Sequence, residues 1–253
     1  MLGRFFGRLT GGNWRPPEQE LAFAASAGFD TVQIRSDRPG EIDDELGIDP
    51  VALGALFDDF GLEPVLEMLV RHSGEPGTIA RALEANLPAI EEVGFLRVHV
   101  HPVGPTEAAP QLAADFAEAL TLAESAGLIL GVEHNAPGHR LLVDAADVEA
   151  LLEAVPGLGL VWDMNHTGTE DIRRFLALRE RITLVHVSDT PLPETNHHLP
   201  LGRGTVDLTP ARTFDDVPLI LEIGGLPHSG GPGLDTDDAL RESFERLRAV
   251  AQE

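Results

Sequence analysis

Apolar runs and turn-forming glycines alternate along the chain with a regular period. Five glycines each follow a segment with helical periodicity and precede a short, mostly β-favouring apolar run: Gly28, Gly61, Gly94, Gly127 and Gly157. Their spacings are 33, 33, 33 and 30 residues, the length of one strand, one helix and two short loops. A glycine at this point is the usual left-handed end of a helix. The pattern therefore predicts repeated strand–helix units.

The repeat extends to eight strands. Besides the five runs after the glycines, residues 4–9, 181–189 and 217–225 have strand-like patterns, and residues 16–28, 107–127 and 235–250 have helical ones. Eight alternating units in 253 residues predict an α/β fold, a closed (β/α)8 or TIM barrel that forms a single domain over residues 1–253. An open doubly wound sheet is the alternative, but no glycine-rich phosphate loop follows the first strand. Only residues 208–216 separate the seventh and eighth units, so the seventh helix is expected to be shortened.

Polar residues end four consecutive predicted strands, the fifth to the eighth. These residues are Glu133, Asp163, His186 and Glu222. Side chains alternate along a strand, and the neighbours of these residues, such as Trp162, are apolar, which places all four polar side chains on the inward face. Since chemistry in such a barrel lies at the carboxyl ends of the strands, the four are candidate site residues. For Asp163 alone, a helix N-cap or a turn is the alternative.

Three carboxylates that converge on a barrel mouth need a counter-charge. All 18 basic residues of the chain are arginine, so no lysine can supply it. A divalent cation supplies it directly, and three carboxylates with one imidazole suit Mn²⁺, Mg²⁺, Co²⁺ or Zn²⁺. We therefore expect one divalent metal ion at this place.

Composition excludes several functions. There is no cysteine, which excludes disulfides and thiolate catalysis, and the absence of lysine excludes Schiff-base chemistry. The formal charge of −24 argues against nucleic acid as a partner. The first residues lack the apolar run of a signal peptide, and no segment is long enough to span a membrane, so a cytoplasmic protein is expected.

Five ordered motifs resemble the xylose isomerase-like TIM barrels, a superfamily that includes sugar phosphate isomerases and epimerases and the AP endonuclease family 2. The motifs are GVEHN at 131–135, VWDMNHTG at 161–168, LVHVSD at 184–189, HLPLGRGTVD at 198–207 and LILEI at 219–223. The resemblance implies that Glu133, Asp163, His186 and Glu222 hold one metal ion. It also implies that Glu133 and Glu222 act as acid and base.

The same resemblance indicates residues that contact the substrate. His166, three residues after the ligand aspartate, would contact substrate oxygens, and Arg203 stands near the position of a substrate-binding arginine. His198 and His101 are further candidates at the mouth, for substrate or for metal. Gln33 stands where many sugar-processing members have a glutamate, which leaves the role of the second strand open.

The main functional hypothesis is a metal-dependent isomerase or epimerase of a sugar or keto-polyol, which acts by proton transfer through a metal-stabilised enediolate. An AP endonuclease-like phosphodiesterase with two or three metal ions is the first alternative. That branch also uses more histidines, for which His72 is a candidate, and has an aspartate where Asn196 stands here. A non-catalytic member that binds a metal or a polyol is the second alternative. The expected partner is a small molecule; barrels of this kind often form homodimers, but the sequence shows no interface pattern.

Overall fold

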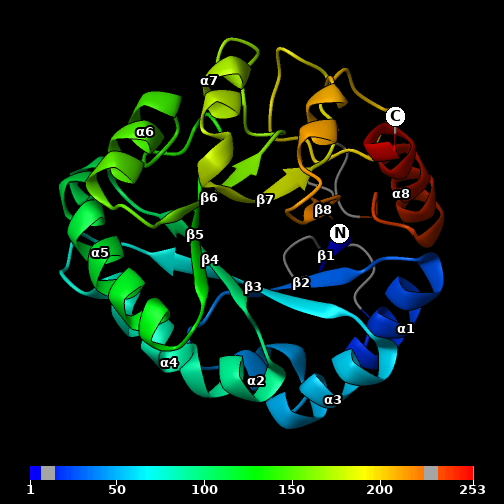
Figure 1. Ribbon diagram of the computed structural model, residues 1–253, viewed down its shortest axis with the longest axis horizontal. Coiled ribbons are helices and arrows are strands. Elements are labelled where there is room, and N and C mark those ends of the chain that lie inside the picture. Colours follow the sequence, from blue (N-terminus) through cyan, green and yellow to red (C-terminus); the bar gives the residue numbers. More distant parts are fainter. Residues whose placement is uncertain (7–14, 225–232, 253) are drawn as a thin grey trace.

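Eight parallel strands form a closed barrel in the order β1 to β8, and helices surround it (Figure 1). The computed structural model describes residues 1–6, 15–224 and 233–252. The strands are β1 (Leu2–Phe6), β2 (Thr31–Ser36), β3 (Glu63–Arg71), β4 (Arg97–Val103), β5 (Ile129–Glu133), β6 (Gly159–Asp163), β7 (Ile182–Val187) and β8 (Leu219–Leu221). The helices are α1 (Pro17–Ala27), α2 (Ile42–Leu46), α3 (Pro50–Phe60), α4 (Thr78–Val93), α5 (Ala109–Ser125), α6 (Ala145–Ala154), α7 (Ile172–Ala177) and α8 (Asp237–Gln252). The predicted TIM barrel is confirmed.

The helix ends follow the glycine pattern. Gly28, Gly61 and Gly94 end α1, α3 and α4 with φ angles of 90°, 65° and 84°, and Gly127 and Gly157 also have positive φ. A residue with a Cβ rarely adopts this conformation, so glycine turns the chain from each helix toward the next strand.

Three details of the barrel concern the predicted boundaries. Between β7 and β8 only a 3₁₀ turn, Thr209–Thr213, takes the place of a helix, which confirms the predicted shortening. The first strand begins two residues earlier than predicted, at Leu2, and residues 7–9 of the prediction lie outside the described residues. A short extra helix, α2, precedes α3.

The barrel interior contains an apolar layer and, closer to the carboxyl ends of the strands, a polar layer. Its buried apolar cluster contains one residue from each of five strands, namely Phe5, Val65, Val161, Leu184 and Ile220. Side chains two residues further along a strand point to the same face, one layer closer to its carboxyl end. For the last four of these strands, those positions are Glu67, Asp163, His186 and Glu222. The polar layer therefore lies next to the apolar layer, on the side of the carboxyl ends of the strands.

Side chains at the alternate positions of the strands point outward and pack against the helices. Trp162 is fully buried between the barrel and α7, where its ring stacks on Phe175 with centroids 6.1 Å apart. Its indole Nε1 donates to Thr167 Oγ1 at 2.9 Å. The alternation predicted for Val161, Trp162 and Asp163 is thus confirmed.

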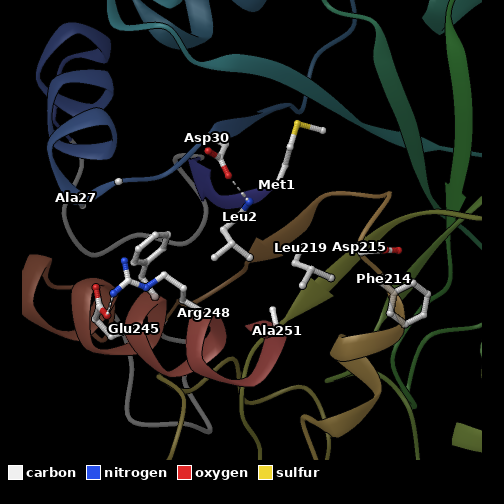
Figure 2. A pocket seen from close by; sticks show the side chains of 12 residues that line it. Met1, Leu2, Ala27, Asp30, Phe214, Asp215, Leu219, Glu245, Arg248 and Ala251 are labelled. Atoms are coloured by element: carbon white, nitrogen blue, oxygen red, sulfur yellow. Dashed lines mark hydrogen bonds and ion pairs between the residues drawn. The ribbon is translucent and has the colours of Figure 1, made fainter. Parts of the chain in front are cut away.

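A cavity of about 400 Å³ lies at the amino-terminal end of the barrel (Figure 2). Leu2 and Leu219, the first residues of β1 and β8, line it together with α8. Two pairs of its polar groups are in contact: Asp30 Oδ2 accepts from the Leu2 amide at 2.8 Å, and Glu245 pairs with Arg248. This end of a TIM barrel serves stability rather than chemistry. No helix among the described residues has the length and hydropathy needed to cross a membrane.

Candidate metal centre

The four strand-end residues come together at the carboxyl end of the barrel. Glu133, Asp163 and His186 end β5, β6 and β7 or lie within them, and Glu222 directly follows β8. One potential ligand atom of each lies within 4.8 Å of those of the other three, and all four side chains are buried. We call this set the four-residue cluster.

His186 lies between two of the carboxylates. Its Nδ1 is 3.2 Å from Glu133 Oε1 and 3.0 Å from Glu222 Oε2. Its Nε2 points the other way and donates to Gln33 Oε1 at 2.9 Å. The ring therefore presents Nδ1 to the cluster.

Burial and charge pull the pKa values of the cluster apart. Burial tends to raise the pKa of Glu133, but His101 and His186 hold it well below its usual range. For Glu222, His186 and His198 outweigh burial and lower the pKa to about 2. Burial, helped by the charge of Glu222, raises the pKa of Asp163 to about 7. The cluster thus lacks the positive charge needed to keep three carboxylates ionised at neutral pH.

Several buried atoms of this cluster have no hydrogen-bond partner among the described residues. One oxygen of each carboxylate is in this position, namely Glu133 Oε2, Asp163 Oδ2 and Glu222 Oε2. Each lies 3.0–3.3 Å from an imidazole nitrogen, of His101, His166 or His186, without a hydrogen bond, and burying three such oxygens together is costly unless a cation contacts them. The donor set of carboxylate oxygens and one imidazole nitrogen fits Mn²⁺, Mg²⁺, Co²⁺ or Zn²⁺. The residues present therefore fit a divalent metal ion.

Asp163 combines both interpretations that its sequence allowed. Its Oδ1 accepts from the Asn165 amide at 2.7 Å, which forms the turn after β6. Its Oδ2 is the unpaired oxygen and lies 3.2 Å from His166 Nε2. One oxygen shapes the turn and the other faces the cluster.

Two of the predicted substrate contacts lie beside the cluster. His166 Nδ1 donates to the His134 carbonyl at 3.1 Å, so Nε2 carries the lone pair. Burial lowers the pKa of His166 to about 3, which keeps this ring neutral. His198 packs edge-on against His166 at 5.5 Å between ring centroids, and its Nδ1 donates to the Glu222 carbonyl at 3.1 Å. His198 therefore also anchors the segment that carries Glu222.

The other two candidates differ in their surroundings. His101 reaches the cluster, where its Nδ1 lies 3.3 Å from both Glu67 Oε1 and Glu133 Oε2. Burial opposes protonation of His101, but the two carboxylates raise its pKa well above the ordinary value. Arg203 is exposed in a turn, and no contact between its side chain and the four-residue cluster occurs among the described residues.

Three polar residues beside the cluster were not among the candidate site residues. Glu67 is a fully buried carboxylate on β3, Asn135 Oδ1 accepts from His101 Nε2 at 2.7 Å, and His99 Nε2 lies 3.6 Å from Glu133 Oε2. The sequence signal for Glu67 is a carboxylate that interrupts the apolar run VLEML. His99 is buried next to the cluster.

His72, the suggested extra ligand, has a different role. Its Nε2 donates to Asp115 Oδ2 at 2.9 Å, and its Nδ1 accepts from the Gly74 amide at 3.0 Å. Asp115 also accepts from the amides of Gly77 and Thr78 at the start of α4. Both ring nitrogens are used, so the suggestion that His72 binds metal is wrong, and the pair organises a helix start instead.

One aspartate shapes the loop that carries His198 and Arg203. Asp189 Oδ1 accepts from the amides of Thr190 and Val206, each at 3.0 Å, and Oδ2 accepts from the Gly202 amide at 2.8 Å. Gly204 lies against this carboxylate, where an added Cβ would be 2.4 Å from both Asp189 Oδ1 and the Thr190 carbonyl oxygen. The loop therefore needs a glycine here.

Gly204→Ala is expected to destabilise the protein by about 1–3 kcal/mol, because the methyl group must displace backbone and a buried carboxylate. Thermal unfolding measures this as a melting temperature lower by about 3–10 °C. Gly168→Ala is the matched control, since an added Cβ there meets nothing within 4 Å. Equal melting temperatures for the two variants would contradict the proposed crowding.

The comparisons with known proteins identify the family of the chain. The family model described as xylose isomerase-like TIM barrel matches residues 21–250. No curated protein matches the chain.

Solved structures share the fold at low sequence identity. A D-tagatose 3-epimerase-like protein is 18% identical, with a TM-score of 0.72, and the match covers 99% of this chain and 97% of that one. The IolI protein with a bound zinc atom is 17% identical, with a TM-score of 0.75 and coverage of 99% and 98%. A fusion of a xylose isomerase-like TIM barrel with 4-hydroxyphenylpyruvate dioxygenase is 22% identical, with a TM-score of 0.74. That match covers 99% of this chain, which spans 43% of the fusion protein.

Such identities show the fold alone, whereas the family model matches most of the sequence. Together with the closed barrel and the residues at its carboxyl end, that match establishes the family. The chain belongs to the xylose isomerase-like TIM barrel family.

Proposed function

We propose that this chain is a divalent-metal-dependent isomerase or epimerase of a sugar or keto-polyol. The observation that carries the proposal is the four-residue cluster, in which each of the three carboxylates has one buried oxygen without a hydrogen bond. A D-tagatose 3-epimerase-like protein and a zinc-containing IolI protein have the same fold, which supports the proposal.

Glu133, Asp163, His186 and Glu222 would hold the metal ion. A divalent ion there supplies polarisation of a substrate carbonyl and neutralises the negative charge that develops when the neighbouring C–H loses its proton.

The side chains of the cluster would move the proton. Glu133 and Glu222 approach from β5 and β8, so one can take a proton from the substrate carbon while the other returns it. Return to the same carbon from the opposite face gives an epimer, and return to the neighbouring carbon gives an isomer. His166 would accept a hydrogen bond from a substrate hydroxyl through Nε2, and its neutral ring leaves that lone pair free. A dehydratase of keto-polyols would begin with the same proton loss.

A multi-metal phosphodiesterase is the second candidate. Two further groups of potential ligands favour it, Asp163 with His166 and His198, and Glu67 with His101 and Glu133. Against it, the Arg35 guanidinium lies 3.4 Å from Glu67 and already supplies positive charge to the second group. Asn196 in the first group's loop offers no carboxylate.

Metal analysis and proton exchange test the proposal. Mass spectrometry of the purified protein is expected to find about one divalent ion per chain. The loaded protein is then incubated in heavy water with a panel of ketoses, keto-polyols and hydroxypyruvate. We expect deuterium in at least one compound, and loss of exchange after chelation. Two or three ions per chain with cleavage of an abasic duplex would establish the phosphodiesterase instead, and metal binding without any exchange would indicate a non-catalytic member.

A further inference from the structure

A chain of buried polar contacts crosses the barrel from β2 and β3 to the metal centre. Arg35 Nη1 lies 3.4 Å from Glu67 Oε1, and Glu67 Oε2 accepts from Gln33 Nε2 at 3.0 Å. Gln33 Oε1 then accepts from His186 Nε2 at 2.9 Å. Gln33, Glu67 and His186 are all fully buried, so water does not substitute for these partners.

The direction of every hydrogen bond in this chain follows from its first member. A guanidinium only donates, and an ionised carboxylate only accepts. Burial raises the pKa of Glu67, but Arg35 and His101 outweigh burial and lower this pKa, so the carboxylate stays ionised. It must therefore accept a hydrogen bond from the NH₂ group of Gln33. The amide carbonyl of Gln33 is then left for His186, whose Nε2 must donate.

We propose that Gln33, oriented by Glu67, is a positioning residue that fixes the His186 ring with Nδ1 toward the metal. Because Nε2 donates to Gln33, Nδ1 is the ring nitrogen that faces Glu133 and Glu222, at 3.2 and 3.0 Å, and it would bind the metal ion after loss of its proton. A partner that holds the second nitrogen of a metal-binding histidine sets its tautomer and its orientation. This inference rests on the proposed function, because it assigns a role toward the metal ion.

The pairing also explains why a glutamine suits position 33. A glutamate there would bring a second carboxylate to about 3 Å from Glu67, and two ionised carboxylates at this distance repel each other. A leucine would leave His186 Nε2 and one oxygen of Glu67 buried without partners. Exchanging the two residue types, with glutamate at 33 and glutamine at 67, reverses the bond between the two residues but keeps the number of hydrogen bonds, an acceptor for His186 Nε2 and the net charge.

Zinc affinity of the purified full-length protein, measured by competition with a chromophoric chelator, tests the inference. Gln33→Leu is expected to bind Zn²⁺ about 10–100-fold more weakly. Glu67→Gln is expected to lose less than about 10-fold, because a neutral amide at 67 no longer dictates which way Gln33 points. Adding Gln33→Glu to Glu67→Gln restores the forced directions and is expected to return affinity to about the wild-type value. Thermal unfolding of the metal-free variants checks that each is folded.

Nuclear magnetic resonance gives an independent readout. In the metal-free wild type and the double variant, the His186 Nε2 proton is expected as a downfield, slowly exchanging signal, and in Gln33→Leu it is expected to move upfield and exchange faster because it loses its acceptor. Wild-type zinc affinity in Gln33→Leu, a double variant no tighter than Glu67→Gln, or an unchanged chemical shift and exchange rate of the Nε2 proton in Gln33→Leu would each overturn the inference. A wild type that binds no zinc would overturn the proposed function, and the NMR signal distinguishes that failure from failure of the hydrogen-bond chain.

Discussion

Replacing Glu133 or Glu222 with glutamine is expected to slow proton exchange at the substrate carbon by about 10³-fold. Glutamine keeps the length of the side chain and an oxygen for the metal ion, but it cannot accept a proton at neutral pH. Both carboxylates are ionised by virtue of the neighbouring imidazoles, which hold their pKa values below the usual range. Each is therefore in the form that can accept a proton at neutral pH.

Deuterium incorporation from heavy water measures the effect, with metal content determined on the same samples so that loss of the ion is separated from loss of the base. Glu63→Gln is the matched control, because Glu63 begins β3 at the other end of the barrel and pairs with Arg97. We expect exchange at the wild-type rate in this control. A wild-type rate of deuterium exchange in both Glu133→Gln and Glu222→Gln, at full metal content, would rule out proton transfer by these two glutamates.

The barrel and the four-residue cluster could be predicted because both depend on short-range patterns. Strand alternation places Val161 and Asp163 inward and Trp162 outward regardless of which strands are neighbours, and the structure has this phase. The regular spacing of the glycines similarly indicates where helices end, because a helix end depends on residues that are close in the sequence. Once eight strands close, residues with the same phase at their carboxyl ends must meet.

Partners that come from distant strands could not be predicted in the same way. Gln33 contacts His186 across the barrel, 153 positions away in the chain, and no local pattern encodes such a pair. His72 shows the converse, since it resembles a ligand in the sequence, but Asp115 on α5 holds it. Glu67 was overlooked because a single acidic residue in an apolar run has no meaning until Arg35 and Gln33 are placed beside it.

Asp163→Asn is expected to abolish tight metal binding and yet to stabilise the metal-free protein at pH 8. Burial and Glu222 raise the Asp163 pKa from 3.8 to about 7, which corresponds to about 4 kcal/mol at most. Since the folded pKa lies above the unfolded one, this contribution to stability is complete below pH 4 and is lost as pH rises toward 7. Asparagine removes the charge, keeps an acceptor for the Asn165 amide and can donate to the His166 Nε2 lone pair. Urea unfolding with chelator, from pH 4 to pH 8, measures the difference.

Glu222→Gln is expected to change the stability of the metal-free protein in the opposite direction to Asp163→Asn. The folded pKa of Glu222 is lowered to about 2, so its ionised form adds stability above pH 4.5 that is lost as pH falls toward 2. Its removal should destabilise the metal-free protein at pH 8 by up to about 3 kcal/mol. Both variants replace a carboxylate of the cluster with a neutral amide, but only an excess of negative charge centred on Asp163 makes their metal-free stabilities change in opposite directions. Shifts of the same sign would mean that the three carboxylates do not compete for His186 as their geometry requires. A metal ion would then have no electrostatic imbalance to correct at this end of the barrel.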